Sequence, residues 1–160
     1  MGGDLLYSGT VAGAREACLL GVPSIAISQY MRRDVERDWF VSAIRAKFVF
    51  ENILNRDRLA AGFWNVNLPA LANPGIEQLF PISDCEPEIQ PLSFSFDAEP
   101  FDGKNAIEMM ENDEPRIIQT VRYKSNYQAR PRTSGSDVEL CFGGHATVSW
   151  LKSNPVADRI

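Results

Sequence analysis

Apolar positions in the first seventy residues follow helical spacing in two stretches, and each stretch leads into a short apolar run. Ser8 can cap a helix whose small apolar residues recur every three or four positions, and Gly21 supplies a stop. Residues 22–28 then form an apolar run that is typical of a buried parallel strand. A second helix is predicted over residues 34–53, and residues 64–69 predict a strand that ends at a proline.

The second predicted helix has two distinct faces. Its apolar face is formed by Val35, Trp39, Phe40, Ala43, Ile44 and Phe48. The other face carries Arg37, Arg45 and Lys47. This spacing is that of an amphipathic helix on a sheet.

After residue 115 the period changes from helical to alternating, which is typical of strands. Strands are predicted over residues 116–123, 138–142 and 146–151, with Gly143-Gly144 as the turn between the last two. Strands that follow one another without helices predict an antiparallel extension. The chain therefore combines half of a parallel α/β sheet with a β-rich arm.

The predicted sheet is too small to stand alone. The chain opens at a helix, with no strand before it, and a sheet of two strands cannot bury both faces. We therefore expect part of the sheet to be encoded upstream of Met1.

Composition places the chain among globular proteins. Of its 160 residues, 44% are apolar and 23% charged, which excludes a wholly disordered or fibrous chain. The net charge of −5 disfavours nucleic-acid binding, and no apolar run is long enough to cross a membrane. Cys18, Cys85 and Cys141 lie far apart and His145 is the single histidine, so reduced thiols and a cytoplasmic location are expected.

Charge is concentrated in residues 84–114, which hold ten acids against one base, Lys104. Three prolines punctuate this stretch and Pro115 follows it, so extended connections with a short helix near 104–111 are expected. It is either a solvated loop region or a docking site for a basic partner. The sequence is thus divided into an α/β core, an acidic connection and a β-rich arm, at residues 1–75, 76–115 and 116–160.

The predicted start of the first helix is the best local candidate for chemistry. Ser8, Gly9 and Thr10 combine two hydroxyls, a residue without a side chain and free helical N–H groups, which together suit a phosphate. The alternative is that Ser8 only caps the helix.

Six further residues invite a functional or structural interpretation. Asn65 and Asn67 alternate along a strand and should share a face, where they either bind substrate or hold neighbouring backbone. His145 follows a glycine turn outside any catalytic pattern, and Cys141 is expected to pack inside a strand. Asp137 and Glu139 are expected on a solvated or salt-bridged strand face.

A basic run with interleaved tyrosines follows the acidic stretch: Arg116, Arg122, Lys124, Arg130 and Arg132. It could meet a nucleotide phosphate or the acidic segment of a partner subunit. It could equally pack on the acidic stretch of its own chain.

Two blocks of sequence resemble the survival protein E (SurE) family. The first is Asp4-Leu5-Leu6-Tyr7-Ser8-Gly9-Thr10-Val11-Ala12-Gly13-Ala14-Arg15-Glu16 with Leu20-Gly21-Val22-Pro23-Ser24-Ile25-Ala26-Ile27-Ser28. The second is the strand Asn65-Val66-Asn67-Leu68-Pro69. Residues 127–144 and 146–149 are similar to the arm and the closing strand of the family.

The resemblance implies a Rossmann-like three-layer α/β/α core, of which this chain holds the C-terminal half. It implies an arm exchanged between subunits in homodimers or homotetramers. It also implies a phosphatase that uses Mg²⁺ or Mn²⁺ to hydrolyse nucleoside 5′- and 3′-monophosphates. In such a site Ser8, Gly9 and Thr10 would bind phosphate on one side of the cavity.

The chain departs from the family in its metal ligands. The family's Asp-Asp pair, loop serine and Ser-Gly-x-Asn asparagine all belong upstream of the segment matching Gly3-Asp4. The resemblance therefore implies a chain that is inactive alone. The alternatives are an interaction module that assembles through its arm, and a nucleotide binder that uses the basic run without metal.

Overall fold

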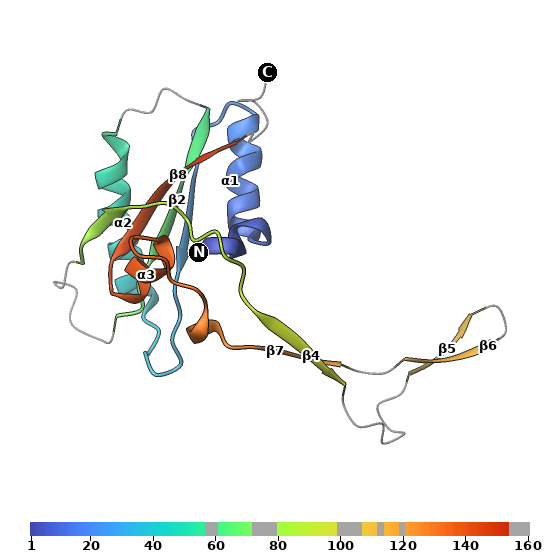
Figure 1. Cartoon of the computed structure of the whole chain (residues 1–160). Helices are drawn as coiled ribbons and strands as arrows, with labels where there is room; N and C mark the ends of the chain where they lie inside the picture. The colour runs from blue at the N-terminus through green and yellow to red at the C-terminus, as the bar shows by residue number, and fades with distance from the viewer. Residues whose placement is uncertain (57–60, 72–79, 99–106, 112–113, 119–120, 154–160) are drawn as a thin grey trace. The chain divides into compact units, whose positions relative to one another are not determined.

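A four-stranded mixed sheet organises most of the chain in the computed structural model, which describes residues 1–56, 61–71, 80–98, 107–111, 114–118 and 121–153 (Figure 1). The strand order is β1-β2-β8-β3. Their bounds are Ile25–Gln29, Gly62–Leu68, Ala146–Lys152 and Ile82–Asp84 respectively. β1 runs parallel to β2, β8 runs antiparallel to β2, and β3 runs parallel to β8.

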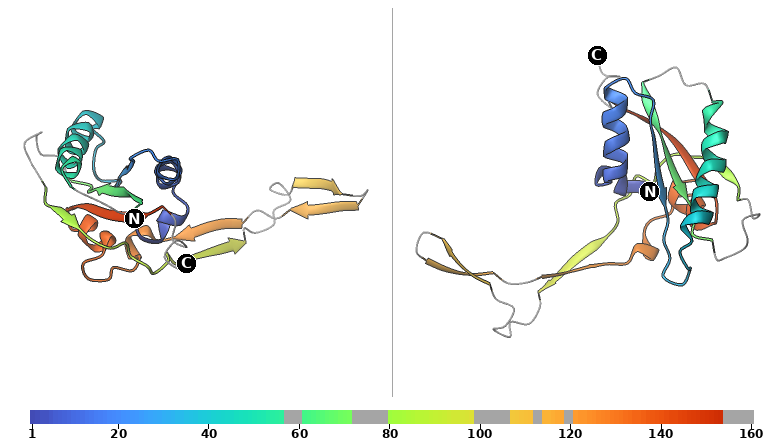
Figure 2. Two further views of the ribbon diagram at one scale, coloured as in Figure 1. Left: turned by 90° about the horizontal axis from the view of Figure 1, so that it is seen from above. Right: turned by 180° about the vertical axis from the view of Figure 1, so that it is seen from behind.

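Two long helices cover opposite faces of this sheet (Figure 2). They are α1, Gly9–Leu19, and α2, Trp39–Leu54. Val66 of β2 packs with Val49 of α2, whereas Phe63 of β2 packs with Val11 of α1. Because residues of opposite parity on a strand face opposite ways, these contacts place the helices in separate layers. The predicted α/β class is confirmed.

The first predicted helix has the expected bounds and the second does not. Ser8 caps α1, and Gly21 follows the helix with a φ of +79°. α2 was expected from residue 34 but begins at Trp39, because the Asp38 carboxylate accepts a hydrogen bond from Val41 N at 3.0 Å.

The predicted apolar face of α2 is also wrong in part. Trp39 and Phe40 are 68% and 67% exposed, while the buried positions are Arg45, Val49 and Ile53. The buried face of α2 therefore includes Arg45, which the sequence pattern assigned to the opposite, polar face.

Residues 138–142, predicted as a strand, form part of a short helix, α3, Asp137–Phe142. Ser136 Oγ accepts a hydrogen bond from Glu139 N, and Glu139 Oε2 accepts one from Gly135 N. This is a variant of the Ser-x-x-Glu capping signature, which outweighs the local alternation. Gly144, with a φ of +96°, ends this helical segment instead of forming a hairpin turn.

A second compact unit, Leu92–Arg130, contains the remaining strands. β4, Phe94–Ala98, pairs antiparallel with β7, Val121–Ser125, and β5, Ile107–Glu111, pairs antiparallel with β6, Glu114–Ile118. The helix expected near 104–111 is wrong, since 107–111 is a strand and 104–106 lie outside the described residues. The strand expected over 116–123 is divided between β6 and β7, and 119–120 are likewise not described.

The first unit comprises Met1–Pro91 and Pro131–Ile160. It includes the predicted strand 146–151 as β8, at the centre of the sheet. Two short 3-10 helices complete the described elements, η1 at Gly2–Leu6 and η2 at Tyr127–Ala129. The division of the sequence at residues 75 and 115 stays a prediction.

Two glycines should respond oppositely to alanine. A Cβ on Gly62 would lie 2.6 Å from Leu151 O and 2.7 Å from the Trp150 ring, so Gly62→Ala should lower the free energy of unfolding by about 1–3 kcal/mol. A Cβ on Gly13, inside α1, would meet nothing within 4 Å, so Gly13→Ala should raise it by about 0.5–1 kcal/mol. Urea unfolding followed by circular dichroism measures both, and equal stabilities would contradict the tight β2–β8 packing.

Candidate phosphate site and the buried polar centre

The starts of α1 and α2 lie at the edge of the sheet where β1 and β2 end (Figure 1). In open α/β sheets ligands bind outside the carboxyl ends of the strands, where helix N-termini attract anions. A ligand site is therefore expected at this edge of the sheet.

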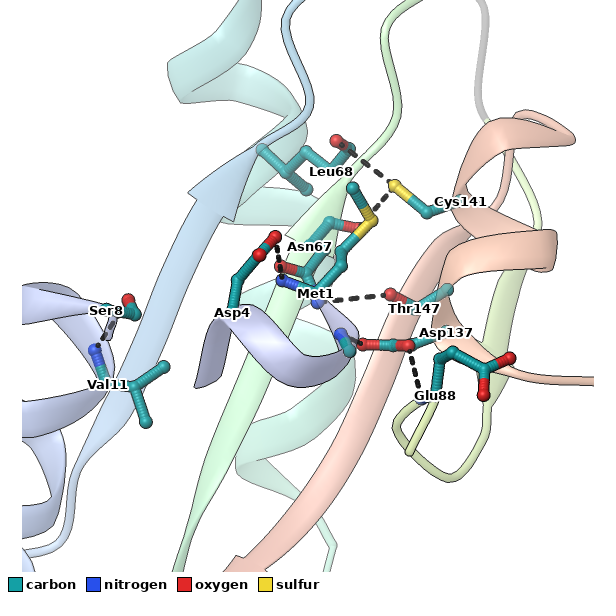
Figure 3. Close-up of polar contacts among 11 residues, drawn as sticks. Met1, Asp4, Ser8, Val11, Asn67, Leu68, Glu88, Asp137, Cys141 and Thr147 are labelled. Atoms are coloured by element: carbon teal, nitrogen blue, oxygen red, sulfur yellow. Dashed lines mark hydrogen bonds and ion pairs between the residues drawn. The ribbon is translucent and has the colours of Figure 1, made fainter. Parts of the chain in front are cut away.

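The structure places Ser8, Gly9 and Thr10 together at the start of α1. Ser8 is half-buried and its Oγ accepts a hydrogen bond from Val11 N at 3.2 Å (Figure 3). Gly9 and Thr10 are exposed, and a Cβ on Gly9 would meet no atom within 4 Å. The surface beside Gly9 is thus open to a ligand. The phosphate-binding role of the three residues stays a prediction.

Polar side chains fill one face of the sheet beside this edge. Asn65 and Asn67 lie on the same face of β2, opposite Ser149 and Thr147 of β8, and all four are buried. Asn67 Nδ2 donates to Thr147 Oγ1 at 3.4 Å, whereas Asn65 Nδ2 has no acceptor among the described residues. The shared face is confirmed.

A buried carboxylate joins three chain segments near these residues. Asp137, fully buried at the start of α3, accepts hydrogen bonds from Gly2 N and Glu88 N, each at 2.8 Å (Figure 3). The expectation of a solvated strand face for Asp137 is therefore wrong. The Ser136 capping signature could have predicted the helix that carries Asp137. No local sequence signal could have predicted its hydrogen bonds to Gly2 and Glu88, which lie far along the chain.

Glu88 is also buried, although it belongs to the acidic stretch that was interpreted as a solvated loop. Its carboxylate accepts hydrogen bonds from Gln90 N at 3.0 Å and Thr133 N at 2.5 Å. These backbone donors, that of Gln90 first, lower the pKa of Glu88 to about 2. At neutral pH Glu88 is therefore a charged structural acceptor.

The three cysteines are free thiols with structural contacts. Cys141 is buried on α3 rather than in a strand, and its Sγ lies 3.6 Å from Leu68 O. Burial raises the pKa of Cys141 to about 12 and that of Cys85 to about 11. Neither thiol is suited to nucleophilic attack at neutral pH, because the thiolate is the reactive form.

His145 precedes β8 rather than lying in a hairpin. Its Nδ1 is 2.8 Å from Ser83 Oγ. In the described ranges no carboxylate is bonded to the ring, so this pair lacks the third group that would orient a catalytic base.

The basic run makes contacts within the chain. Lys124 of β7 forms an ion pair with Asp97 of the acidic stretch. The Arg130 guanidinium lies 4.5 Å from the centre of the Tyr127 ring, and that of Arg132 lies 4.5 Å from the centre of the Phe142 ring. The side chain of Arg116 is not among those described.

The part of the chain that the structure describes contains no group of three His, Cys, Asp or Glu side chains that could hold a metal ion. The described residues do not by themselves fit the divalent-metal site that the resemblance implies. None of the described helices is both long and apolar enough to span a bilayer.

Comparison with known proteins assigns the chain to a family. The family model of survival protein SurE matches residues 1–84, which include α1, β1, α2 and β2. The chain belongs to the SurE family. Over 154 residues this SurE-family chain is 34% identical to a relative from Synechocystis sp., covering 95% of this chain and 59% of the relative. It is 31% identical over 161 residues to the 5′-nucleotidase SurE of Roseobacter denitrificans, covering 96% of this chain and 56% of that protein.

The fold agrees with this assignment. The crystal structure of the SurE protein from Aquifex aeolicus superposes with a TM-score of 0.69 at 21% identity, over all of this chain and 59% of that one. The chain thus spans a little more than half the length of the relatives it matches, and it corresponds to their C-terminal part.

Removing the Asp137 carboxylate should destabilise the first unit strongly. Asp137→Ala leaves the amides of Gly2 and Glu88 buried without an acceptor, at a cost of about 1–3 kcal/mol each. As a control, Asp34→Ala removes an exposed partner of Arg32 and should change the free energy of unfolding far less. Urea unfolding compares the two variants, and equal losses would contradict a structural role for Asp137.

Acid should remove the stabilisation contributed by Glu88. Its pKa falls from an ordinary 4.5 to about 2 on folding, so its contribution is complete above pH 4.5 and is lost as the pH falls toward 2. The free energy of unfolding of Glu88→Gln should therefore depend less on pH between 5 and 2 than that of the wild type. Glu86→Gln, at an exposed position, is the control, and parallel curves for all three proteins would refute this assignment.

Proposed function

We propose that this chain is the C-terminal half of a metal-dependent nucleotidase that hydrolyses nucleoside 5′- and 3′-monophosphates. The observation that carries the proposal is the open start of α1, where Ser8, Gly9 and Thr10 lie at the carboxyl edge of a SurE-family sheet. The name of the Roseobacter denitrificans relative, 5′-nucleotidase SurE, supports the substrate class.

In this proposal the chain binds and orients the phosphate. The free N–H groups of the first turn of α1 and its positive dipole end attract the phosphate oxygens, and Gly9 leaves room for close approach. Ser8 Oγ holds the Val11 amide and so fixes the geometry of the turn. The polarisation of the phosphoryl group and the activation of water would be supplied by a divalent metal, Mg²⁺ or Mn²⁺, and its ligands would have to come from outside the described residues of this chain.

Hydrolysis by this chain would require metal ligands from another polypeptide segment. Since its described residues form no metal-binding group, we propose that it has no hydrolytic activity alone. We also propose that the protein is cytoplasmic and that residues 116–160 contribute to a homodimer or homotetramer.

A second candidate function, an interaction module, is favoured by a groove along β1. The groove has a volume of about 730 Å³ and is lined mainly by apolar side chains, among them Val22, Ile25, Phe50 and Leu54. In the described sheet β1 is an edge strand, so its outer edge is available for pairing. The occupant we propose is an apolar strand of a complete SurE-family chain.

The direct test is phosphate release from 5′-AMP and 3′-AMP by the purified, folded chain, with and without Mn²⁺ or Mg²⁺. We expect no turnover, because the family's metal ligands are absent from the sequence. Metal-dependent turnover would refute the proposed inactivity.

The interaction-module alternative is tested by mixing this chain with a complete SurE-family protein, followed by size-exclusion chromatography. Formation of a mixed complex would support it.

Binding of inorganic phosphate tests the site itself. Ser8→Ala should weaken the phosphate-dependent amide shifts of Gly9, Thr10 and Val11 in nuclear magnetic resonance spectra, and should cost about 1 kcal/mol of stability. Ser136→Ala removes the equivalent cap of α3 and is the matched control, with unchanged phosphate binding. Equal phosphate affinity in both variants would reduce Ser8 to a helix cap.

A further inference from the structure

A second cavity lies where β1 ends and α2 begins. Its volume is about 170 Å³, and its lining includes Gln29 at the end of β1, Asp38 and Ser42 at the start of α2, Arg45 one turn further on, and Leu71. A water molecule occupies about 30 Å³ in the liquid. The cavity therefore has room for a group of about five or six heavy atoms, such as a phosphate.

Arg45 is the unusual residue of this lining. It is only 9% exposed, and its guanidinium carbon lies 6.0 Å from the centre of the Phe80 ring. Among the residues that the structure describes, no carboxylate forms an ion pair with Arg45 and no acceptor is hydrogen-bonded to it. Burial lowers the pKa of this guanidinium, with the Asp38 charge opposing the shift.

The buried Arg45 guanidinium lacks hydrogen-bond acceptors among the described residues. Its guanidinium stays protonated at any physiological pH and offers five N–H donors in a planar fork. Removing such a cation from water without a partner is costly. An oxyanion in the cavity would supply both the opposite charge and the missing acceptors.

Two cations and two carboxylates line the cavity, so its charges balance when Arg45 is included. Arg37 adds a cation, and Glu36 and Asp38 add two carboxylates. The Asp38 carboxylate accepts the Val41 N hydrogen bond and so already neutralises part of the helix start. Arg45 is the buried cation of this lining, and its guanidinium donors have no acceptor among the described residues, which favours an anionic ligand.

We propose that this cavity binds a phosphate-sized oxyanion through the Arg45 guanidinium, with the Gln29 amide as a second donor. The phosphate chemistry is shared by inorganic phosphate and by the phosphate group of a nucleotide. This site lies on the α2 side of the sheet and does not depend on the phosphate site proposed at Ser8, on the α1 side.

Amide and arginine side-chain spectra of the ¹⁵N-labelled chain distinguish the two sites. Inorganic phosphate and 5′-AMP are titrated separately at constant ionic strength. We expect inorganic phosphate to shift the Arg45 Nε–H signal and the amides of Asp38, Val41 and Ser42. An equal response to 5′-AMP would show that the cavity admits an esterified phosphate, and a response to inorganic phosphate alone would restrict it to the free ion. Shifts only at Gly9, Thr10 and Val11 would overturn this proposal while supporting the phosphate site at α1.

Two variants complete the test. Arg45→Gln should weaken phosphate binding at this cavity about tenfold or more, because a charge-assisted hydrogen bond is lost. Arg33→Gln removes an exposed cation from the loop between β1 and α2. Arg33 does not line the cavity, so this variant should leave the phosphate affinity unchanged.

Arg45→Met separates binding from packing. It should unfold at an equal or higher urea concentration than the wild type without phosphate, yet lose the stabilisation that phosphate gives. A less stable Met variant that keeps its phosphate response would overturn the proposal.

Discussion

The Asp137 carboxylate holds backbone groups that lie 135 and 49 residues away in the sequence, at Gly2 and Glu88. A fully buried carboxylate is tolerated only when its oxygens have donors, and here each oxygen has a backbone amide. The same carboxylate thus determines how η1, the connection before residue 91 and α3 meet. Because η1 leads directly into α1, the position of the Ser8 helix start depends on this contact.

Glu88 extends the arrangement. Its backbone amide donates a hydrogen bond to Asp137, and its carboxylate accepts hydrogen bonds from the amides of Gln90 and Thr133. Two buried carboxylates thus organise the irregular chain around α3. Irregular backbone inside a protein has no ladder partners of its own, and charged acceptors can satisfy several amides at once. These acids are therefore part of the scaffold that positions the exposed helix start.

The α/β arrangement brings two helix starts to one sheet edge on opposite faces. At α1 the first turn is exposed and its serine cap leaves Gly9 open, whereas at α2 an aspartate caps the helix and a buried arginine lines the adjacent cavity. The first is open to solvent, and the second is lined by a buried cationic side chain. The edge strand β1 lies between the two helices, which is why a partner strand at its groove would lie close to both.

Local sequence determined the elements whose signals lie within a few residues. The Ser8 cap, Gly21 and the apolar runs predicted α1, β1 and β2, and alternation predicted β8. The family blocks at 4–28 and 65–69 pointed to the fold because they combine several such signals. Only the tertiary structure decided that 137–142 is a helix, that Arg45 is buried and that β8 joins β2. A capping side chain outweighs the local period in the first case. In the others, the partners lie far along the chain, where no short-range pattern records which groups will share a buried environment.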